Sequence, residues 1–283
     1  MNTLFSRLVS LLPAHAISGL VYKLTRVRLV WLKNALIRLF IKVFHVDMRQ
    51  AAEPDACAYK DFNSFFTRAL RQDARPLATE AAAILCPVDG QVSQLGEIED
   101  KQIFQAKHHH YSLTALLGGS EALANHFING RFCTIYLSPR DYHRIHMPLS
   151  GQLREMTYVP GKLFSVNQTT VRMIPGLFAR NERVINIFDT EQGPMAMIMV
   201  GAINVGSMET VWHGCITPPY RNEVITWRYD PQTVSLDAGD EMGRFNMGST
   251  VILLFGKETM DWNEALQDAS RVQMGQLLGR LNN

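Results

Sequence analysis

The spacing of hydrophobic residues changes along the chain. In roughly the first 60 residues, apolar side chains recur every three or four positions, as they do on one face of an amphipathic helix. Between Val21 and Phe44 this face is formed by Leu29, Leu32, Leu36, Phe40 and Val43. Further along, short apolar runs are bounded by Gly, Pro, Asn or Asp, a pattern that predicts strands. The predicted strands are Arg131–Leu137, Gln152–Val159, Arg183–Phe188, Met195–Val200, Glu223–Tyr229 and Thr250–Phe255.

This change of spacing predicts an α+β fold with two regions. Residues 1–60 form an N-terminal amphipathic helical region, and residues 61–283 form a β-rich, mainly antiparallel core. The segment 61–71 connects them. The chain has 283 residues, of which 47% are hydrophobic. That is enough for one large domain with an appendage, and it excludes a disordered protein.

Charge is distributed unevenly between the two regions. The whole chain carries a formal charge of +2, but residues 1–50 contain eight basic residues and one acidic residue, a net +7 that leaves −5 for the remainder. Such a basic block suits nucleic acid or an anionic membrane. Because large apolar residues lie between its cations, we expect residues 1–60 to bind an anionic membrane surface and not nucleic acid. A helix packed on the protein's own core is the alternative, and both arrangements can hold for different helices.

No segment is predicted to cross a bilayer. The longest uncharged run near the start, Leu8–Tyr22, has fifteen residues and contains Pro13. A spanning helix needs about 20 apolar residues. We therefore expect a peripheral membrane protein.

The cysteine and histidine patterns do not indicate a metal site. Four cysteines lie far apart without a CxxC pair, which argues against zinc and disulfides and fits a cytoplasmic setting. His143 and His146 form an HxxH pair, but Pro139 and Pro148 bracket a segment too short for the helix that would turn both rings to one side. We expect no metal.

Three segments are dense in reactive groups: 86–90, 136–148 and 242–250. They offer an aspartate, two histidines and a serine, which are the residue types of nucleophilic catalysis. A lipid hydrolase with Ser249 as nucleophile is one possibility, although the surrounding sequence MGSTV lacks a G-x-S-x-G elbow. A non-catalytic peripheral membrane module is another, and it leaves these residues without a role.

The step from Gly248 to Ser249 has two interpretations. It can be an ordinary turn into the strand that follows. Alternatively, because glycine reaches backbone conformations closed to other residues, it can hold a strained peptide bond whose carbonyl is attacked by the serine hydroxyl.

The motifs together resemble those of the bacterial phosphatidylserine decarboxylases, which depend on a pyruvoyl group. The order along the chain is also that of the family. Met247 and Val88 are two small apolar departures from its usual motifs. The matching segments are FFTR at 65–68, PVDG at 87–90, YLSPRDYHRIHMP at 136–148, GAINVGS at 201–207 and EMGRFNMGST at 241–250.

The resemblance implies a self-processing triad of Asp89, His146 and Ser249. The aspartate orients the histidine, the histidine takes the serine proton, and the hydroxyl attacks the Gly248 carbonyl. The chain is then cut into 1–248, the β chain, and the 35-residue 249–283, the α chain. Ser249 becomes a covalent pyruvoyl cofactor, which forms a Schiff base with the serine headgroup and accepts electrons as carbon dioxide leaves. A histidine of near-neutral pKa suits protonation of the resulting carbanion, and we assign this role to His143.

The resemblance also implies the partners. The substrate is phosphatidylserine in an anionic membrane surface, and the product is phosphatidylethanolamine. The β chain stays with the α chain after cleavage, and the processed units form a homodimer. Residues 1–60 are then a membrane-association region and residues 61–283 a catalytic domain, bound peripherally at the cytoplasmic face of the cell membrane.

Overall fold

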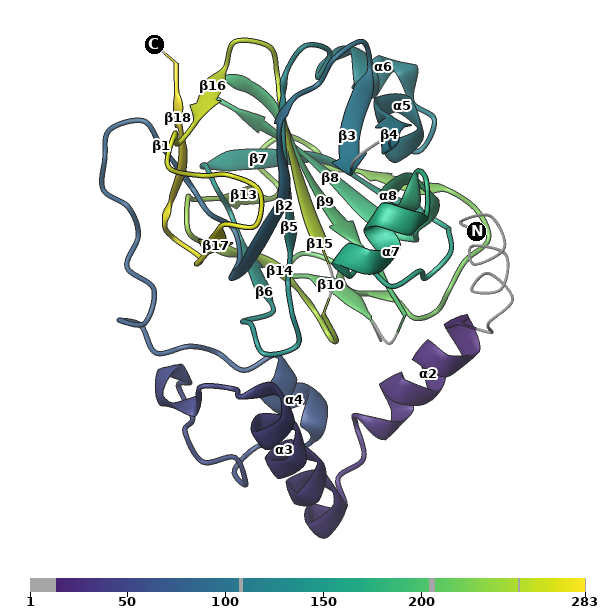
Figure 1. Cartoon of the computed structure of the whole chain (residues 1–283), viewed down its shortest axis with the longest axis vertical. Helices are drawn as coiled ribbons and strands as arrows, with labels where there is room; N and C mark the ends of the chain where they lie inside the picture. Colours follow the sequence, from purple (N-terminus) through teal and green to yellow (C-terminus); the bar gives the residue numbers. More distant parts are fainter. Residues whose placement is uncertain (1–13, 107–108, 204–206, 249, 283) are drawn as a thin grey trace.

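The computed structural model describes residues 14–106, 109–203, 207–248 and 250–282. Antiparallel sheets form the body of the molecule, and a group of helices from the start of the chain lies below it in the view of Figure 1. The predicted α+β fold, with a β-rich antiparallel core and an N-terminal helical region, is confirmed.

The N-terminal helices of the described chain are α2 (Ala14–Leu24), α3 (Val30–Phe44), the 3₁₀ helix η1 (Met48–Gln50) and α4 (Phe62–Phe66). Aromatic packing joins two of them, α3 and α4. A capping box between Asp61 and Ser64 begins α4, which has only five residues. The three phenylalanines of α4 contact the ring of Phe40 on α3, with ring centroids 5.1 to 6.0 Å apart. The segment expected to connect the two regions therefore contains a packed helix.

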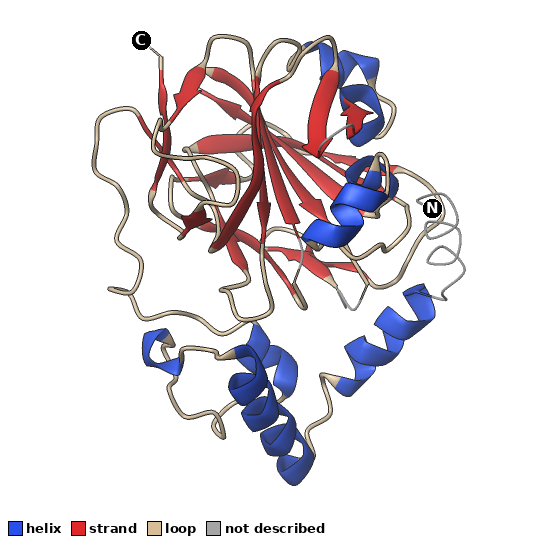
Figure 2. Ribbon diagram, in the orientation of Figure 1, coloured by secondary structure: helices blue, strands red, loops and turns tan. Residues whose placement is uncertain are grey.

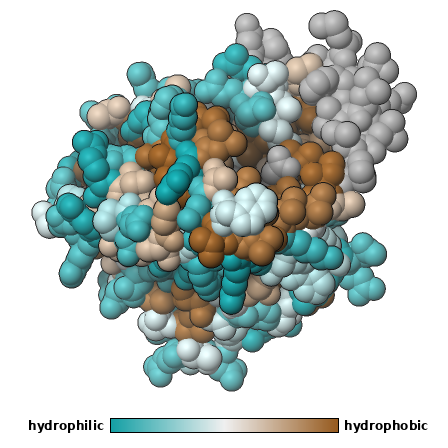
Figure 3. Space-filling model, turned by 90° about the horizontal axis from the view of Figure 1, so that it is seen from below, coloured by the Kyte–Doolittle hydropathy of each residue, from teal (hydrophilic) through white to brown (hydrophobic). Residues whose placement is uncertain are grey.

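Most of the predicted apolar face of α3 is exposed. Ile37 and Lys33 are buried on the inner side of the helix. Leu29, Leu36 and Val43 have 56%, 37% and 57% of their surface exposed. Figure 3 views the molecule from below and shows patches of apolar residues bordered by hydrophilic ones. α3 thus packs on the protein through one face and turns another apolar face outward. Among the described residues, no helix has the length and apolar character needed to cross a membrane.

One large sheet runs through the body (Figure 2). At its centre, β15 (Thr250–Phe255) is hydrogen-bonded to β9 on one side and to β5 on the other. Every residue of β15 is buried, which accounts for its unbroken apolar sequence. All six predicted strands lie in this sheet. From edge to edge its order is β12 (Ile225–Arg228), β7 (Gly151–Val159), β8 (Arg183–Thr190), β9 (Gly193–Val200), β15, β5 (Arg131–Tyr136), β2 (Gly90–Glu97) and β17 (Arg271–Val272), with β13 (Ser235–Leu236) also paired to β7.

Smaller sheets and short helices complete the described fold. One sheet has the order β11 (Gly214–Thr217), β10 (Met208–Thr210), β14 (Glu241–Phe245) and β6 (Arg144–His146). Another has the order β1 (Ala83–Leu85), β18 (Leu277–Leu281) and β16 (Met260–Trp262), and β3 (Gln102–Ala106) pairs with β4 (His109–Ser112). The remaining helices are α5 (Leu113–Leu116), α6 (Glu121–Asn125), α7 (Gln168–Met173) and α8 (Leu177–Arg180).

Candidate active site around Gly248

Two strand pairings bring the reactive segments together. In the large sheet, Thr250 at the start of β15 lies opposite Tyr136 at the end of β5. In the smaller sheet, Arg244 on β14 lies opposite Arg144 on β6. The connection from β5 to β6 therefore lies against the connection from β14 to β15. The first contains His143 and the second contains Gly248.

Crowding explains why residue 248 is a glycine. A Cβ atom at Gly248 would lie 2.7 Å from Nε2 of His143 and 3.2 Å from the carbonyl oxygen of Leu137. The φ angle of Gly248 is not in the left-handed region. Close approach of the histidine, and not a left-handed backbone, is therefore the reason for a glycine at this position, and the interpretation as a strained bond to Ser249 stays a prediction. Ser249 lies outside the described residues.

His143 is buried and uncharged, with one ring nitrogen turned toward Gly248. Its Nδ1 lies 2.7 Å from the backbone carbonyl oxygen of Asp141. Because a carbonyl only accepts hydrogen bonds, Nδ1 carries the proton and Nε2 carries a lone pair. Nε2 is buried and has no hydrogen-bond partner among the described residues. Burial, with a smaller contribution from the charge of Arg68, lowers the pKa of His143 to about 3. The near-neutral pKa that we expected for this residue is wrong, because the ring is completely desolvated.

Phe66 on α4 covers the imidazole of His143. The two ring centroids are 4.1 Å apart, and Phe66 is almost fully buried. The N-terminal helices therefore close one side of the site and exclude water from it.

His146 lies in β6 and has partners at both ring nitrogens. Nδ1 donates to the Gly239 carbonyl oxygen over 2.7 Å, and Nε2 accepts from the Tyr142 hydroxyl over 2.9 Å. Burial lowers the pKa of His146. This histidine is also an uncharged base, but its lone pair is bonded to a tyrosine.

Asp89 is buried beside an arginine. Its two carboxylate oxygens accept hydrogen bonds from Nε and from a terminal nitrogen of Arg75. Oδ1 also accepts from the backbone N–H of Met274, over 2.9 Å. The backbone near Asp89 runs alongside β6, because the Pro87 carbonyl oxygen accepts from the N–H of His146 over 2.9 Å. Among the described residues, no hydrogen bond joins the Asp89 carboxylate to either histidine.

Asp141 was missed by reasoning from the sequence. Its Oδ2 accepts from both the backbone N–H and the hydroxyl of Ser138, each over 2.7 Å, and its Oδ1 accepts from Arg271 over 2.6 Å. These bonds hold the carbonyl that orients His143. An aspartate two residues before that histidine was visible in the motif. No feature of the sequence pointed to Arg271, which lies in β17.

A small apolar pocket adjoins Gly248. Its volume is about 210 Å³. Phe40 and Phe44 of α3 line it together with Phe66, Tyr136 and Met247. Among the described residues, no group of three or more His, Cys, Asp or Glu is arranged to hold a metal ion. The covalent group implied at position 249 fits this place, because the chain itself would carry it and the unpartnered nitrogen of His143 lies beside the preceding residue, Gly248.

The fold and this site define a class of protein: an α+β protein in which a buried, uncharged histidine faces a glycine–serine step at the start of a central strand. Comparison with known proteins gives the family. The family model described as phosphatidylserine decarboxylase matches residues 62–280, and a second model, described as PSD, matches residues 4–45. The chain belongs to the phosphatidylserine decarboxylase family, as its motifs indicated.

Several relatives are named phosphatidylserine decarboxylase proenzyme. The one from Nitrosococcus oceani is 56% identical over 96% of this chain and 89% of its own length. One from Pseudomonas aeruginosa is 56% identical over 95% of this chain and 93% of its own length. One from Ectopseudomonas mendocina is 55% identical over 95% of both chains.

Proposed function

We propose that this protein decarboxylates phosphatidylserine, giving phosphatidylethanolamine and carbon dioxide. Relatives that share its length carry the name of this activity, and they do not favour a lipid hydrolase or a non-catalytic membrane module. The observation that carries the proposal is the position of His143 Nε2, an uncharged base placed against Gly248 in a water-excluded site.

The chain first cuts itself between Gly248 and Ser249. The Ser249 hydroxyl oxygen attacks the Gly248 carbonyl carbon, so that an ester replaces the peptide bond. Elimination breaks the ester C–O bond, releases the Gly248 carboxylate and leaves dehydroalanine, which takes up water and loses ammonia. A pyruvoyl group then begins the α chain, 249–283, and the β chain is 1–248. The word proenzyme in the relatives' names supports this step.

Asp89, His146 and Ser249 carry out this cleavage in our proposal, which for these residues depends on the motif resemblance. For His146 to take the serine proton, its Nε2 must exchange the Tyr142 hydroxyl for that of Ser249. His143 is the second candidate for this base, because its Nε2 already faces Gly248.

In decarboxylation, His143 moves the proton that the reaction needs. A pyruvoyl ketone supplies an electron acceptor for the serine headgroup once it has combined with the headgroup amine. That amine arrives as an ammonium ion and must lose a proton to react. His143 is uncharged at neutral pH and takes this proton at Nε2. The imidazolium then returns the proton to the α-carbon after carbon dioxide has left.

The helices at the start of the chain support a membrane substrate. A groove of about 490 Å³ between α2 and α3 is lined almost entirely by apolar side chains. It shares Phe40, Phe44 and Met247 with the pocket beside Gly248. A lipid held at the exposed face of α3 therefore has an apolar route to the site. We place the protein peripherally at the cytoplasmic face of the cell membrane, on its anionic lipids.

Mass spectrometry of the purified protein tests the proposed cleavage. We expect two fragments, one that ends at Gly248 and one that begins at position 249. The smaller fragment should be blocked to Edman degradation and lighter than an N-terminal serine would make it, because the amine and hydroxyl have been replaced by a ketone. One stable chain of 283 residues would refute the proposal.

Single substitutions separate the two histidines. We expect Ser249→Ala, Asp89→Ala and His146→Ala to stay uncut, and His143→Ala to be cut but unable to release carbon dioxide from phosphatidylserine vesicles. His126→Ala, at an exposed histidine, is the control and should be cut and active. An uncut His143→Ala together with a cut His146→Ala would transfer the cleavage role to His143.

A further inference from the structure

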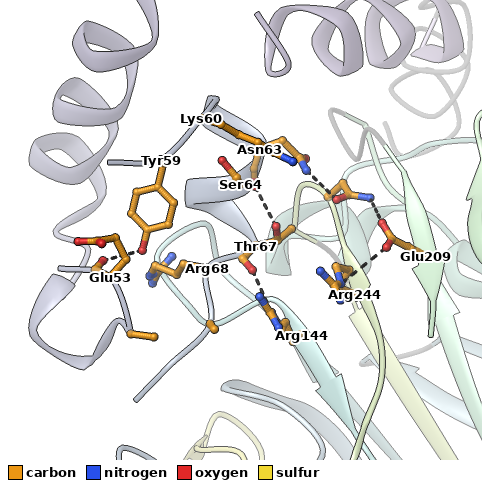
Figure 4. A pocket seen from close by; sticks show the side chains of 13 residues that line it. Glu53, Tyr59, Lys60, Asn63, Ser64, Thr67, Arg68, Arg144, Glu209 and Arg244 are labelled. Atoms are coloured by element: carbon orange, nitrogen blue, oxygen red, sulfur yellow. Dashed lines mark hydrogen bonds and ion pairs between the residues drawn. The ribbon is translucent and has the colours of Figure 1, made fainter. Parts of the chain in front are cut away.

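A second, polar pocket lies on the opposite side of α4 from Phe66, which covers His143. Its volume is about 450 Å³, and it lies between α4, the loop before it and the ends of β6, β10 and β14 (Figure 4). None of its lining residues lines the pocket beside Gly248. Its charged lining consists of Lys60, Arg68, Arg144 and Arg244, with Glu53 and Glu209.

Two of the arginines are fixed by a glutamate. Arg144 and Arg244 lie 2.9 and 2.8 Å from the two carboxylate oxygens of Glu241. Arg144 Nε also donates to the Thr67 carbonyl oxygen over 3.0 Å. Figure 4 shows both arginines at the sheet side of the pocket, Arg144 beside Thr67 and Arg244 beside Glu209, with which it forms an ion pair. Both guanidinium groups keep unused N–H donors.

Arg68 is different, because nothing among the described residues neutralises it. The side chain is buried, with 4% of its surface exposed, and it forms no ion pair in the described part of the chain. Its only hydrogen bond there joins a terminal nitrogen to the Arg140 carbonyl oxygen over 3.3 Å, and its Nε has no partner. A buried cation is unfavourable unless an anion accompanies it.

Lys60 adds a fourth cation, at the exposed rim of the same pocket. Neutral polar side chains complete the lining, since Ser64 and Asn63 also face the pocket in Figure 4. Four cations approach from the helix side and from the sheet side. This arrangement suits a tetrahedral oxyanion, whose oxygens point in several directions, better than a planar carboxylate.

We propose that this pocket binds a phosphate group, with Arg68 as its central partner. The group can belong to a phospholipid headgroup or to free phosphate, because both present the same oxyanion. None of the residues that line this pocket is one to which we assign a step of the proposed decarboxylation.

Isothermal titration with inorganic phosphate tests the site. We expect one saturable site in the wild-type protein, about tenfold weaker binding in Arg68→Gln, and several-fold weaker binding in Lys60→Gln, because each change removes a charge-assisted contact. Lys257→Gln, an exposed lysine outside the pocket, should bind as the wild type does. Acetate, a planar carboxylate, should not compete.

A parallel titration with dihexanoyl phosphatidylglycerol identifies the source of the phosphate. Competition between this lipid and inorganic phosphate assigns the pocket to lipid headgroups, and binding of inorganic phosphate alone assigns it to the free ion. If Arg68→Gln fails to fold, Lys60→Gln decides the outcome. Absence of saturable phosphate binding in the wild type, or wild-type binding in Lys60→Gln and in a folded Arg68→Gln, would overturn the proposal. Lys60→Gln should still cut itself between Gly248 and Ser249, so that loss of phosphate binding is distinguishable from failure of the proposed self-cleavage.

Discussion

His143 and Gly248 show how single residues shape the site. The histidine donates from Nδ1 to a backbone carbonyl, so its remaining lone pair points at the glycine. Burial keeps the ring uncharged. A charged imidazolium already carries a proton at Nε2, so it could not accept one from the substrate amine. The desolvation that depresses the pKa therefore keeps Nε2 free of a proton, and it also makes the ring a weaker base.

The same burial predicts acid sensitivity. The pKa of His143 is about 3 in the folded protein and 6.5 ordinarily. Between these values the unfolded chain binds a proton that the folded protein does not, so stability falls as the pH falls, by about 1.4 kcal/mol per pH unit. Urea unfolding should be measured at pH 7 and pH 5 in the uncut Ser249→Ala protein, with and without His143→Gln. The loss on acidification should be about 2 kcal/mol smaller with His143→Gln. Equal losses of stability in the two proteins would contradict the lowered pKa of His143.

Among the elements, α3 has two roles because it has two apolar faces. Its inner face packs against α4 through Phe40, and its outer face exposes Trp31 and Leu39, at 72% and 59%. A helix that only completed the core would not leave residues of this size in water. The exposed face, with the cations beside it, is the surface that we assign to the membrane.

Leu39→Asp should weaken sedimentation with vesicles that contain phosphatidylserine, and it should leave self-cleavage intact. The added charge would have to enter the lipid interface, whereas in the free protein it stays in water. Val224→Asp is the matched control, because Val224 is similarly exposed, at 51%, in the segment leading to β12. Equal sedimentation of the two variants would remove α3 from the membrane surface.

The sequence predicted the elements of the large sheet better than those of the site. Runs such as Thr250–Phe255 are apolar enough to identify a buried strand directly. β6 and β14 are short and contain charged residues, so their pairing depends on packing that no local pattern reveals. The same limit applies to Asp89. The motif marked it as reactive, but its partners Arg75 and Met274 are 14 and 185 residues away in the chain, and only the fold brings them together.

At the scale of the whole molecule, the position of β15 determines whether the two fragments would stay together after the proposed cleavage. This strand would begin the 249–283 fragment, and it pairs over six residues with each of its neighbours in the 1–248 fragment. Arg271 and the backbone of Met274 add bonds to Asp141 and Asp89. The proposed cut would therefore remove one covalent bond from an interface that otherwise remains complete.

We expect the two fragments to elute together from a size-exclusion column in native buffer. They should separate only in denaturant, because β15 cannot leave without exposing the core of the large sheet. The uncut Ser249→Ala protein is the control and should elute at the same native volume. Separation of the fragments in native buffer would show that the strand pairing does not hold them.

The central place of β15 has a further consequence for the life of the protein. Before cleavage, folding is a first-order process within one chain. After cleavage, unfolding is also dissociation, so refolding becomes second order and slows as the fragments are diluted. If the proposed cleavage holds, a processed molecule that opens would reassemble slowly when dilute, and a new pyruvoyl group would require a newly made chain. The working lifetime of the enzyme is then set by the rate at which the large sheet opens, and not by an equilibrium between folded and unfolded forms.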